Sequence, residues 1–245
     1  YAQIGGDYIT LKDNQQTVVL HNQGAGWTSI FTTNDYGRHT MNRSGSTFAV
    51  INNEGFVYDG YLHVYQQNQV NMQYSLLGLS IDTYGTTRNA LALNSVNGPG
   101  CRVAFFDNGP SYGMVVYEFN GSWNRLGSAI QSSALGFGEH CALNGTGDRL
   151  LIQTNQAIYV YDYIESDWEL VHTIQDTMIR NGIWGASLNE QGNRVSYLDA
   201  QKNIRVYTMG MDDTAIQLRG IGGKKASASL YAGAGAGYPH TFPSK

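Results

Sequence analysis

The chain has 245 residues, of which 14% are charged, and its net charge at neutral pH is -4. Such a charge balance excludes the strongly basic surface that binding to nucleic acid or to an anionic membrane requires. No apolar stretch approaches the length of about 20 residues that spans a bilayer, so we expect no insertion into a membrane.

Short strands recur along the chain, and three residue markers keep the same order within each unit. The first is a Val in an apolar strand, at Val19, Val64, Val116, Val160 and Val206. Successive Val markers lie 44 to 52 residues apart, which is the period of propeller blades. The second marker is an apolar residue and Asn before a Gly-containing turn, at Asn42, Asn94, Asn144 and Asn189. The third is an aromatic residue three positions before an aliphatic one, at Trp27, Tyr74, Trp123 and Trp168.

The clearest unit begins at Trp123 and ends at Tyr163. It predicts four strands over 123–130, 140–144, 149–154 and 158–163, each bounded by Gly, Asn, Asp or Ser. The 140–144 type of strand contains small side chains, so we expect it innermost in a narrow ring. The strand that begins with the aromatic marker is then outermost, with its ring against the neighbouring sheet.

The two ends of the chain complement each other in this repeat. Residues 5–22 match 145–163, so the chain enters in the middle of a unit, and 225–231 match an inner strand. The sequence therefore predicts an all-β fold, a single five-bladed β-propeller with four-stranded antiparallel blades. We expect the C-terminal inner strand to close the ring by pairing with the N-terminal strands. The propeller covers 1–231, with one blade split between 1–32 and 225–231, and 232–245 form an extended tail.

The links from each outer strand to the next inner strand lie on one face of the predicted ring. Longer links at 53–60 and 108–113 join them there, and this face collects aromatic side chains and arginines. Large ring faces and guanidinium groups suit the recognition of sugars or proteins. The predicted binding face consists of Tyr36, Arg38, Tyr58, Tyr84, Arg88, Tyr112, Phe137 and Trp184.

Candidate catalytic patterns are weak. Gly109 to Gly113 match G-x-S-x-G, but a nucleophile elbow needs a strand-to-helix turn, and here the motif joins two strands. The six histidines show no metal-ligand spacing, and we expect His39 and His140, near the inner strands, to be satisfied polar residues. A glycosidase needs two convergent carboxylates, and only Glu139 starts an inner strand. We therefore predict no catalytic residues and no enzyme.

The aromatic-Gly openings at Phe137-Gly138, Tyr36-Gly37 and Tyr84-Gly85, with the Leu143 to Arg149 turn and Val160-Tyr161, resemble FG-GAP repeats. These are the repeats of integrin-α-like propellers. The resemblance implies a propeller with a protein-binding or carbohydrate-binding surface that is usually extracellular. Family members often bind calcium through an Asp-rich loop, but the corresponding loops here lack the alternating carboxylates that calcium needs. We expect neither a metal nor a cofactor.

From these observations we predict a non-catalytic module for protein–protein interaction or structural assembly. Its place would be extracellular, on a cell surface or on a virion surface, and its partner a protein or a glycan. The C-terminal tail is a candidate for assembly contacts. The alternative is a lectin that uses the aromatic loop face, and a glycoside hydrolase ranks third.

Overall fold

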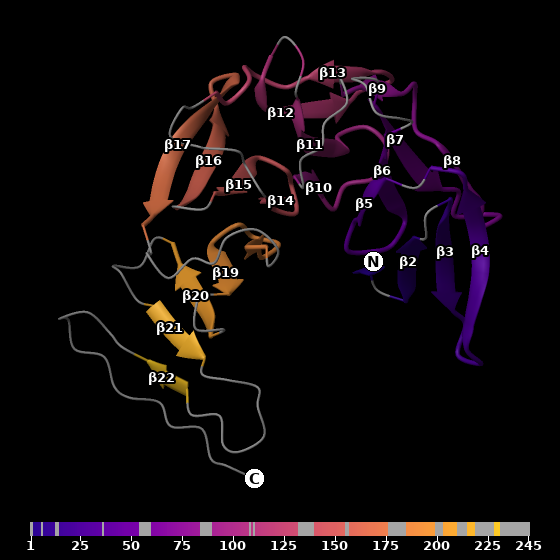
Figure 1. Cartoon of the computed structure of the whole chain (residues 1–245), viewed down its shortest axis with the longest axis horizontal. Helices are drawn as coiled ribbons and strands as arrows, with labels where there is room; N and C mark the ends of the chain where they lie inside the picture. The colour runs from indigo at the N-terminus through magenta and orange to yellow at the C-terminus, as the bar shows by residue number, and fades with distance from the viewer. Residues whose placement is uncertain are drawn as a thin grey trace.

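The chain folds into five antiparallel β-sheets, and every element among its described residues is a strand. Figure 1 shows the five sheets following one another along an arc. No helix in this part of the chain is long and apolar enough to cross a membrane. The computed structural model describes residues 2–5, 7–12, 15–35, 37–53, 60–83, 90–107, 109, 111–131, 140–154, 157–175, 185–198, 203–209, 215–218 and 228–230.

Each sheet is built from consecutive strands. The first contains β1 (Ala2–Gly5), β2 (Tyr8–Lys12), β3 (Thr17–Asn22) and β4 (Trp27–Thr33). The second contains β5 (Arg38–Met41), β6 (Thr47–Asn53), β7 (Gly60–Gln67) and β8 (Tyr74–Leu76), with β9 (Ile81–Asp82) also paired to β7. The third contains β10 (Leu91–Leu93), β11 (Arg102–Asp107), β12 (Gly113–Phe119) and β13 (Trp123–Arg125).

The last two sheets complete the arc. The fourth contains β14 (His140–Leu143), β15 (Arg149–Gln153), β16 (Ile158–Ile164) and β17 (Asp167–Ile174). The fifth contains β18 (Ser187–Leu188), β19 (Arg194–Leu198), β20 (Ile204–Thr208), β21 (Ala215–Leu218) and β22 (Ala228–Leu230). The five Val markers of the sequence all lie in third strands, so the repeat predicted from them is confirmed.

The first strands of the sheets lie on the inside of the arc. The strands β1, β5, β10, β14 and β18 contact one another in that order. The strands β4, β8, β13 and β17, at the opposite edges of their sheets, lie on the outside of the arc (Figure 1). The prediction of small-residue strands inside is thus confirmed for β5, β10, β14 and β18, and that of aromatic strands outside for β4, β8, β13 and β17. The C-terminal strand, which was also expected inside, is the outermost strand of its sheet.

Four apolar clusters hold neighbouring sheets together, one between each consecutive pair. Between the third and fourth sheets, Phe106 and Val116 meet Leu150 and Ile152, all at most 5% exposed. Leu151, also fully buried, faces the fifth sheet instead. Because successive strand residues point to opposite faces, the apolar run in β15 is explained by burial on both sides.

The Asn markers fix the turn between the first and second strands of a sheet. The side-chain oxygen of Asn144 accepts the backbone N–H of Arg149 at 3.0 Å, and that of Asn189 accepts the N–H of Arg194 at 2.8 Å. Asn42 makes the equivalent bond to Thr47. Such side-chain bonds replace a backbone partner where the strands separate.

The aromatic markers join the outer edges of neighbouring sheets. The indole nitrogen of Trp123 donates to the carbonyl of Leu77 at 2.7 Å, and that of Trp168 donates to Leu126 at 2.9 Å. Each acceptor belongs to the preceding sheet, and a Gly follows it. The predicted coverage of the neighbouring sheet by the outer aromatics is therefore confirmed for these two residues.

The two ends of the chain differ from the prediction. Strand β22 pairs with β21, with Leu230 opposite Ile216, and not with the N-terminal strands. The first sheet has its own inner strand, β1, in which Ala2 lies opposite Leu11. A hairpin between β21 and β22 closes a short loop, which costs less chain entropy than joining opposite ends of the protein. The predicted tail, 232–245, lies outside the described residues.

Candidate functional site

The predicted binding face can be placed only in part. Tyr36, Tyr58, Tyr84, Arg88, Phe137 and Trp184 lie outside the described residues. Arg38 lies in β5 of the second sheet, and Tyr112 in the link between β11 and β12 of the third. Tyr112 is 51% exposed, with its ring edge-on to Phe106 at 5.5 Å between centroids.

The link before Arg38 carries a group that the sequence reading missed. Asp35 lies between β4 and β5, is 6% exposed, and accepts hydrogen bonds from three elements. Its Oδ2 atom accepts from Tyr65 at 2.6 Å and Thr33 at 3.0 Å, and its Oδ1 atom from Asn52 at 3.0 Å. The fourth contact joins Oδ2 to Nδ1 of His63, at 2.8 Å. A buried carboxylate with this many donors is held in one orientation.

The electrostatics of the cluster keep Asp35 ionised. Burial alone would raise the pKa of this carboxyl, but the hydrogen bonds from His63, Tyr65 and Thr33 and the charge of His63 outweigh it. Together they hold the pKa of Asp35 below its ordinary value. Burial, and then the bond to Asp35, raises the pKa of Tyr65 to about 12, so its hydroxyl stays a donor at neutral pH.

This arrangement sets the tautomer of His63. An ionised carboxylate can only accept, so Nδ1 of His63 carries a hydrogen, and in the neutral form of the ring Nε2 presents its lone pair. The side chain is 20% exposed, and Nε2 has no partner among the described residues. A neutral imidazole oriented by a buried carboxylate can take a proton from water or from a substrate hydroxyl.

Two signals in the sequence point to this pair. In the repeat, His63 stands directly before the marker Val64, where the third sheet has Val115, which is 1% exposed. A titratable residue where another sheet buries a Val needs a polar partner if it is buried as well. Asp35 directly precedes Tyr36, which the predicted binding face already included.

The histidines of the inner strands are neutral residues. Burial, followed by the charges of Lys12 and the N-terminus, lowers the pKa of His39 to about 4, although contacts with Gly37 and Thr10 oppose this. Burial likewise lowers the pKa of His140 to about 4, against a backbone bond to Ala186 and with help from the charge of Arg38.

We expect the pKa values of His39 and His140 to lie well below that of a histidine in water, which is about 6.5. Because folding lowers the pKa values of both histidines, their protonation favours the unfolded chain. The free energy of unfolding is therefore highest above pH 6.5 and declines as the pH falls towards 4. For His39 the loss reaches about 3 kcal/mol. An NMR titration of the His Cε1 protons measures the pKa values directly, and urea unfolding at pH 7.5 and 4.5 measures the stability. Six titrations all between pH 6 and 7 would contradict this prediction.

The G-x-S-x-G segment forms a turn, as predicted. The N–H of Tyr112 donates to the carbonyl of Gly109 at 3.0 Å, and the Ser111 hydroxyl accepts from Arg125 at 2.7 Å. An Arg donor cannot take a proton from Ser111. Among the residues that the structure describes, no group of three or more His, Cys, Asp or Glu could hold a metal ion.

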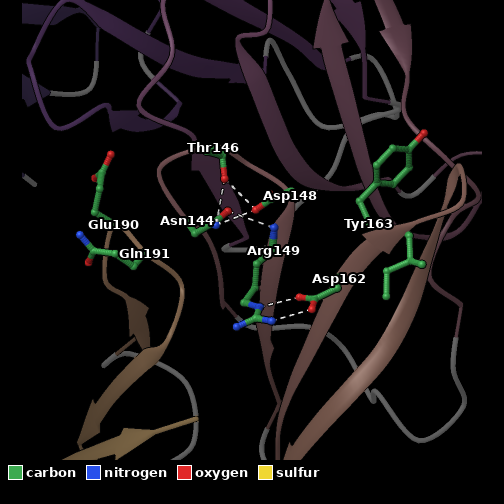
Figure 2. A pocket seen from close by; sticks show the side chains of 9 residues that line it. Asn144, Thr146, Asp148, Arg149, Asp162, Tyr163, Glu190 and Gln191 are labelled. Carbon is green, nitrogen blue, oxygen red and sulfur yellow. Dashed lines mark hydrogen bonds and ion pairs between the residues drawn. The ribbon is translucent and has the colours of Figure 1, made fainter. Parts of the chain in front are cut away.

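A polar pocket of about 480 Å³ lies between the fourth and fifth sheets. Figure 2 shows the β14–β15 turn in its middle, with Glu190 on one side and Asp162 and Tyr163 on the other. It opens on the turns between first and second strands, whereas Asp35 lies on a link between sheets. Since strands alternate in direction, the pocket and the Asp35–His63 cluster are on opposite faces of the arc.

Comparisons with known proteins concern the fold. No family model matches the chain, and no curated protein matches it. The solved structure of the periplasmic gluconolactonase PpgL of Pseudomonas aeruginosa is similar over 91% of this chain and 71% of its own, with 12% identity and a TM-score of 0.59. Sqt1 of Saccharomyces cerevisiae is similar over 96% of this chain and 69% of its own, with 14% identity and a TM-score of 0.58. A protein from Lactobacillus plantarum gives 10% identity, coverage of 99% and 83%, and a TM-score of 0.56.

These similarities establish a β-propeller-like, all-β fold. They also correct the predicted function. The expectation of a non-catalytic module, for assembly or as a lectin, is contradicted because the fold is shared with a gluconolactonase. The prediction that the chain is not an enzyme is contradicted by the same finding. Paired carboxylates were expected of a hydrolase, whereas the structure places a histidine beside a carboxylate. The resemblance to FG-GAP repeats stays a prediction.

Proposed function

We propose that the chain is a hydrolase of cyclic esters, with His63 as general base and Asp35 as the group that orients it. The observation that carries the proposal is the 2.8 Å contact between Nδ1 of His63 and Oδ2 of Asp35. Burial of the carboxylate and partial exposure of the imidazole add to it. The fold shared with a gluconolactonase supports a sugar lactone as the substrate class.

In the proposed reaction, Nε2 of His63 takes a proton from water while the water oxygen bonds to the carbonyl carbon of the lactone. The ring C–O bond of the resulting tetrahedral intermediate then breaks. The leaving oxygen takes the proton from Nε2, which gives a hydroxy acid and a neutral histidine. The negative charge of Asp35 stabilises the imidazolium that exists between these two proton transfers.

The test is hydrolysis of gluconolactone, followed by acid release at constant pH. Because lactones also open spontaneously in water, the protein must raise the rate above a matched blank. A rate equal to the blank with both gluconolactone and a simple aliphatic lactone would overturn the proposal. The contribution of His63 is measured with the variants considered in the Discussion.

We also propose that the five sheets are the blades of a five-bladed propeller that closes when the last sheet packs against the first. Support comes from Trp27. It begins β4 as Trp123 begins β13, yet it is 46% exposed, whereas Trp168 in the fourth sheet is 9% exposed. In a closed ring, the repeat places a carbonyl of the fifth sheet beside the Trp27 indole. Closure by facing sheets requires no shared strand.

Ring closure predicts equal costs for two matched substitutions. Trp168→Phe removes the indole bond to Leu126, and we expect a loss of about 1–2 kcal/mol of unfolding free energy. Trp27→Phe should cost about the same if the fifth sheet covers this residue. Urea unfolding measures both, with Leu170→Ala, at a 52% exposed position of β17, as the control. A Trp27→Phe protein as stable as the wild type would contradict closure.

The expected protein or glycan partner and the extracellular or surface location stay predictions. Neither is needed for the proposed hydrolysis. The Asp35–His63 pair lies on the link face where the sequence predicted binding, so a substrate would enter from that side.

A further inference from the structure

The pocket between the fourth and fifth sheets is built separately from the proposed hydrolytic site. Its walls come from the β14–β15 turn, the end of β16 and the β18–β19 turn. Its volume of about 480 Å³ lies in the range of small-molecule sites. Its lining is polar apart from Ile164 and the ring of Tyr163.

Asp148 is held in place with one oxygen left for a ligand. Its Oδ1 atom accepts from Asn144 Nδ2 and from Thr146 Oγ1, both at 2.7 Å (Figure 2). Its Oδ2 atom has no partner among the described residues. Although partial burial alone would raise it, the hydrogen bonds from Thr146 and Asn144 lower the pKa of Asp148, so the group is a carboxylate at neutral pH.

The one guanidinium of the pocket is already matched. Arg149 binds both oxygens of Asp162, each at 2.5 Å, and its Nη1 donates to the carbonyl of Gly192 at 3.0 Å. This pairing removes Arg149 as a receptor for an anionic ligand. Glu190 is partly matched as well, because Nη1 of Arg43 lies 3.6 Å from its Oε2 atom. Asp148 is therefore the carboxylate of the pocket that has no ion pair among the described residues.

Glu190 closes the pocket from the fifth sheet. Its Oε2 atom accepts from the Ser95 hydroxyl at 3.1 Å, and its backbone carbonyl accepts from the N–H of Gly145 at 2.8 Å. A Cβ at Gly145 would come within 2.1 Å of Glu190 Oε1, so a larger residue there would displace the Glu190 side chain. The acceptor positions on the two sides of the pocket are therefore fixed before any ligand arrives.

We propose that this pocket binds a small polyhydroxylated molecule that is neutral or carries an ammonium group. Asp148 and Glu190 accept hydrogen bonds from its hydroxyl or ammonium groups, and the ring of Tyr163 provides an apolar wall for its C–H face. The charge of Asp148, which no cation of the described residues pairs, repels a sugar acid. The pocket is consequently not where the acid product of lactone hydrolysis would bind.

The test compares three ligands by isothermal titration calorimetry: the amino sugar glucosamine, the neutral sugar glucose and the sugar acid gluconate. We expect glucosamine to bind most tightly, glucose more weakly and gluconate not at all. Asp148→Asn, which keeps the shape and removes the charge, should weaken glucosamine binding about tenfold. Glu169→Gln changes an exposed carboxylate of β17 outside the pocket, and it should leave binding unchanged.

Gluconate binding as tight as glucosamine binding would overturn the proposal, as would three blank titrations. Equal losses in Asp148→Asn and Glu169→Gln would also overturn it, because they would indicate general attraction to an acidic surface. The variants of His63 leave this binding unchanged. Loss of hydrolysis and loss of sugar binding therefore report on the two sites independently.

Discussion

Replacement of His63 by Gln lowers kcat for lactone hydrolysis by about 10²- to 10⁴-fold, the range for loss of a general base. Gln fills a similar volume and can still donate to Asp35, so the buried carboxylate keeps a partner and the fold is retained. Its amide nitrogen cannot take a proton from water at neutral pH. KM should change little, because the base acts in the chemical step. Initial rates against lactone concentration, at a fixed pH, separate kcat from KM.

His172→Gln is the matched control for this experiment. His172 is a half-buried histidine of β17 beside Tyr207, in another sheet. Its substitution should leave kcat unchanged. Asp35→Asn is the second test of the pair: it preserves shape but removes the charge that stabilises the imidazolium. A His63→Gln enzyme with wild-type kcat would show that the Asp35–His63 pair is structural only.

Substitution of Gly37 by Ala should prevent stable folding or cost more than about 4 kcal/mol. A Cβ at this position would stand 1.3 Å from the carbonyl oxygen of Ile51 and 2.6 Å from its carbonyl carbon. Ile51 lies in β6, paired to Arg38 directly after the Gly. Because the obstacle is backbone in a paired strand, the clash cannot be relieved by a side-chain rotation.

Gly24→Ala provides the comparison. Gly24 has φ of +84°, and a Cβ there would meet nothing within 4 Å. Its cost is that of a left-handed backbone alone, about 1 kcal/mol. Soluble yield and the urea midpoint of the two variants measure the difference. Equal stability of the two would mean that β6 can move away from the link at Gly37.

Gly37 also shows why part of this fold can be predicted from the sequence. The Gly of an opening, the Asn before a turn and the Trp of an outer strand each solve a local packing problem, and the Asn and Trp bonds recur in more than one of the described sheets. Gly37 admits the neighbouring backbone, Asn144 replaces a missing backbone partner, and Trp168 reaches the preceding sheet. When the same packing problem recurs, the residues that solve it recur at a regular spacing in the sequence. The order of the strands and the number of sheets can therefore be predicted from that spacing.

The Asp35–His63 pair cannot be predicted from the repeat, because it occurs in one place only among the described residues. Asp35 and His63 are 28 positions apart and belong to a link and a strand of different repeat units. Their contact depends on how the second sheet packs against the first. The same holds for the pocket, where Asp148 and Glu190 come from turns of two sheets. The position of β22 was missed for another reason: a strand of three residues resembles an inner strand as well as a hairpin partner.

The contiguity of each sheet has a consequence for synthesis of the protein. All strands of the first sheet, β1 included, come from the first 33 residues of the sequence. This sheet has its full set of strands as soon as that segment leaves the ribosome, and each later sheet can add to an ordered neighbour. A propeller that shared a strand between its two ends would keep an unpaired edge open until translation finished, when it could pair with another nascent chain. Here each sheet can complete its pairing from its own segment of the chain as that segment is synthesised.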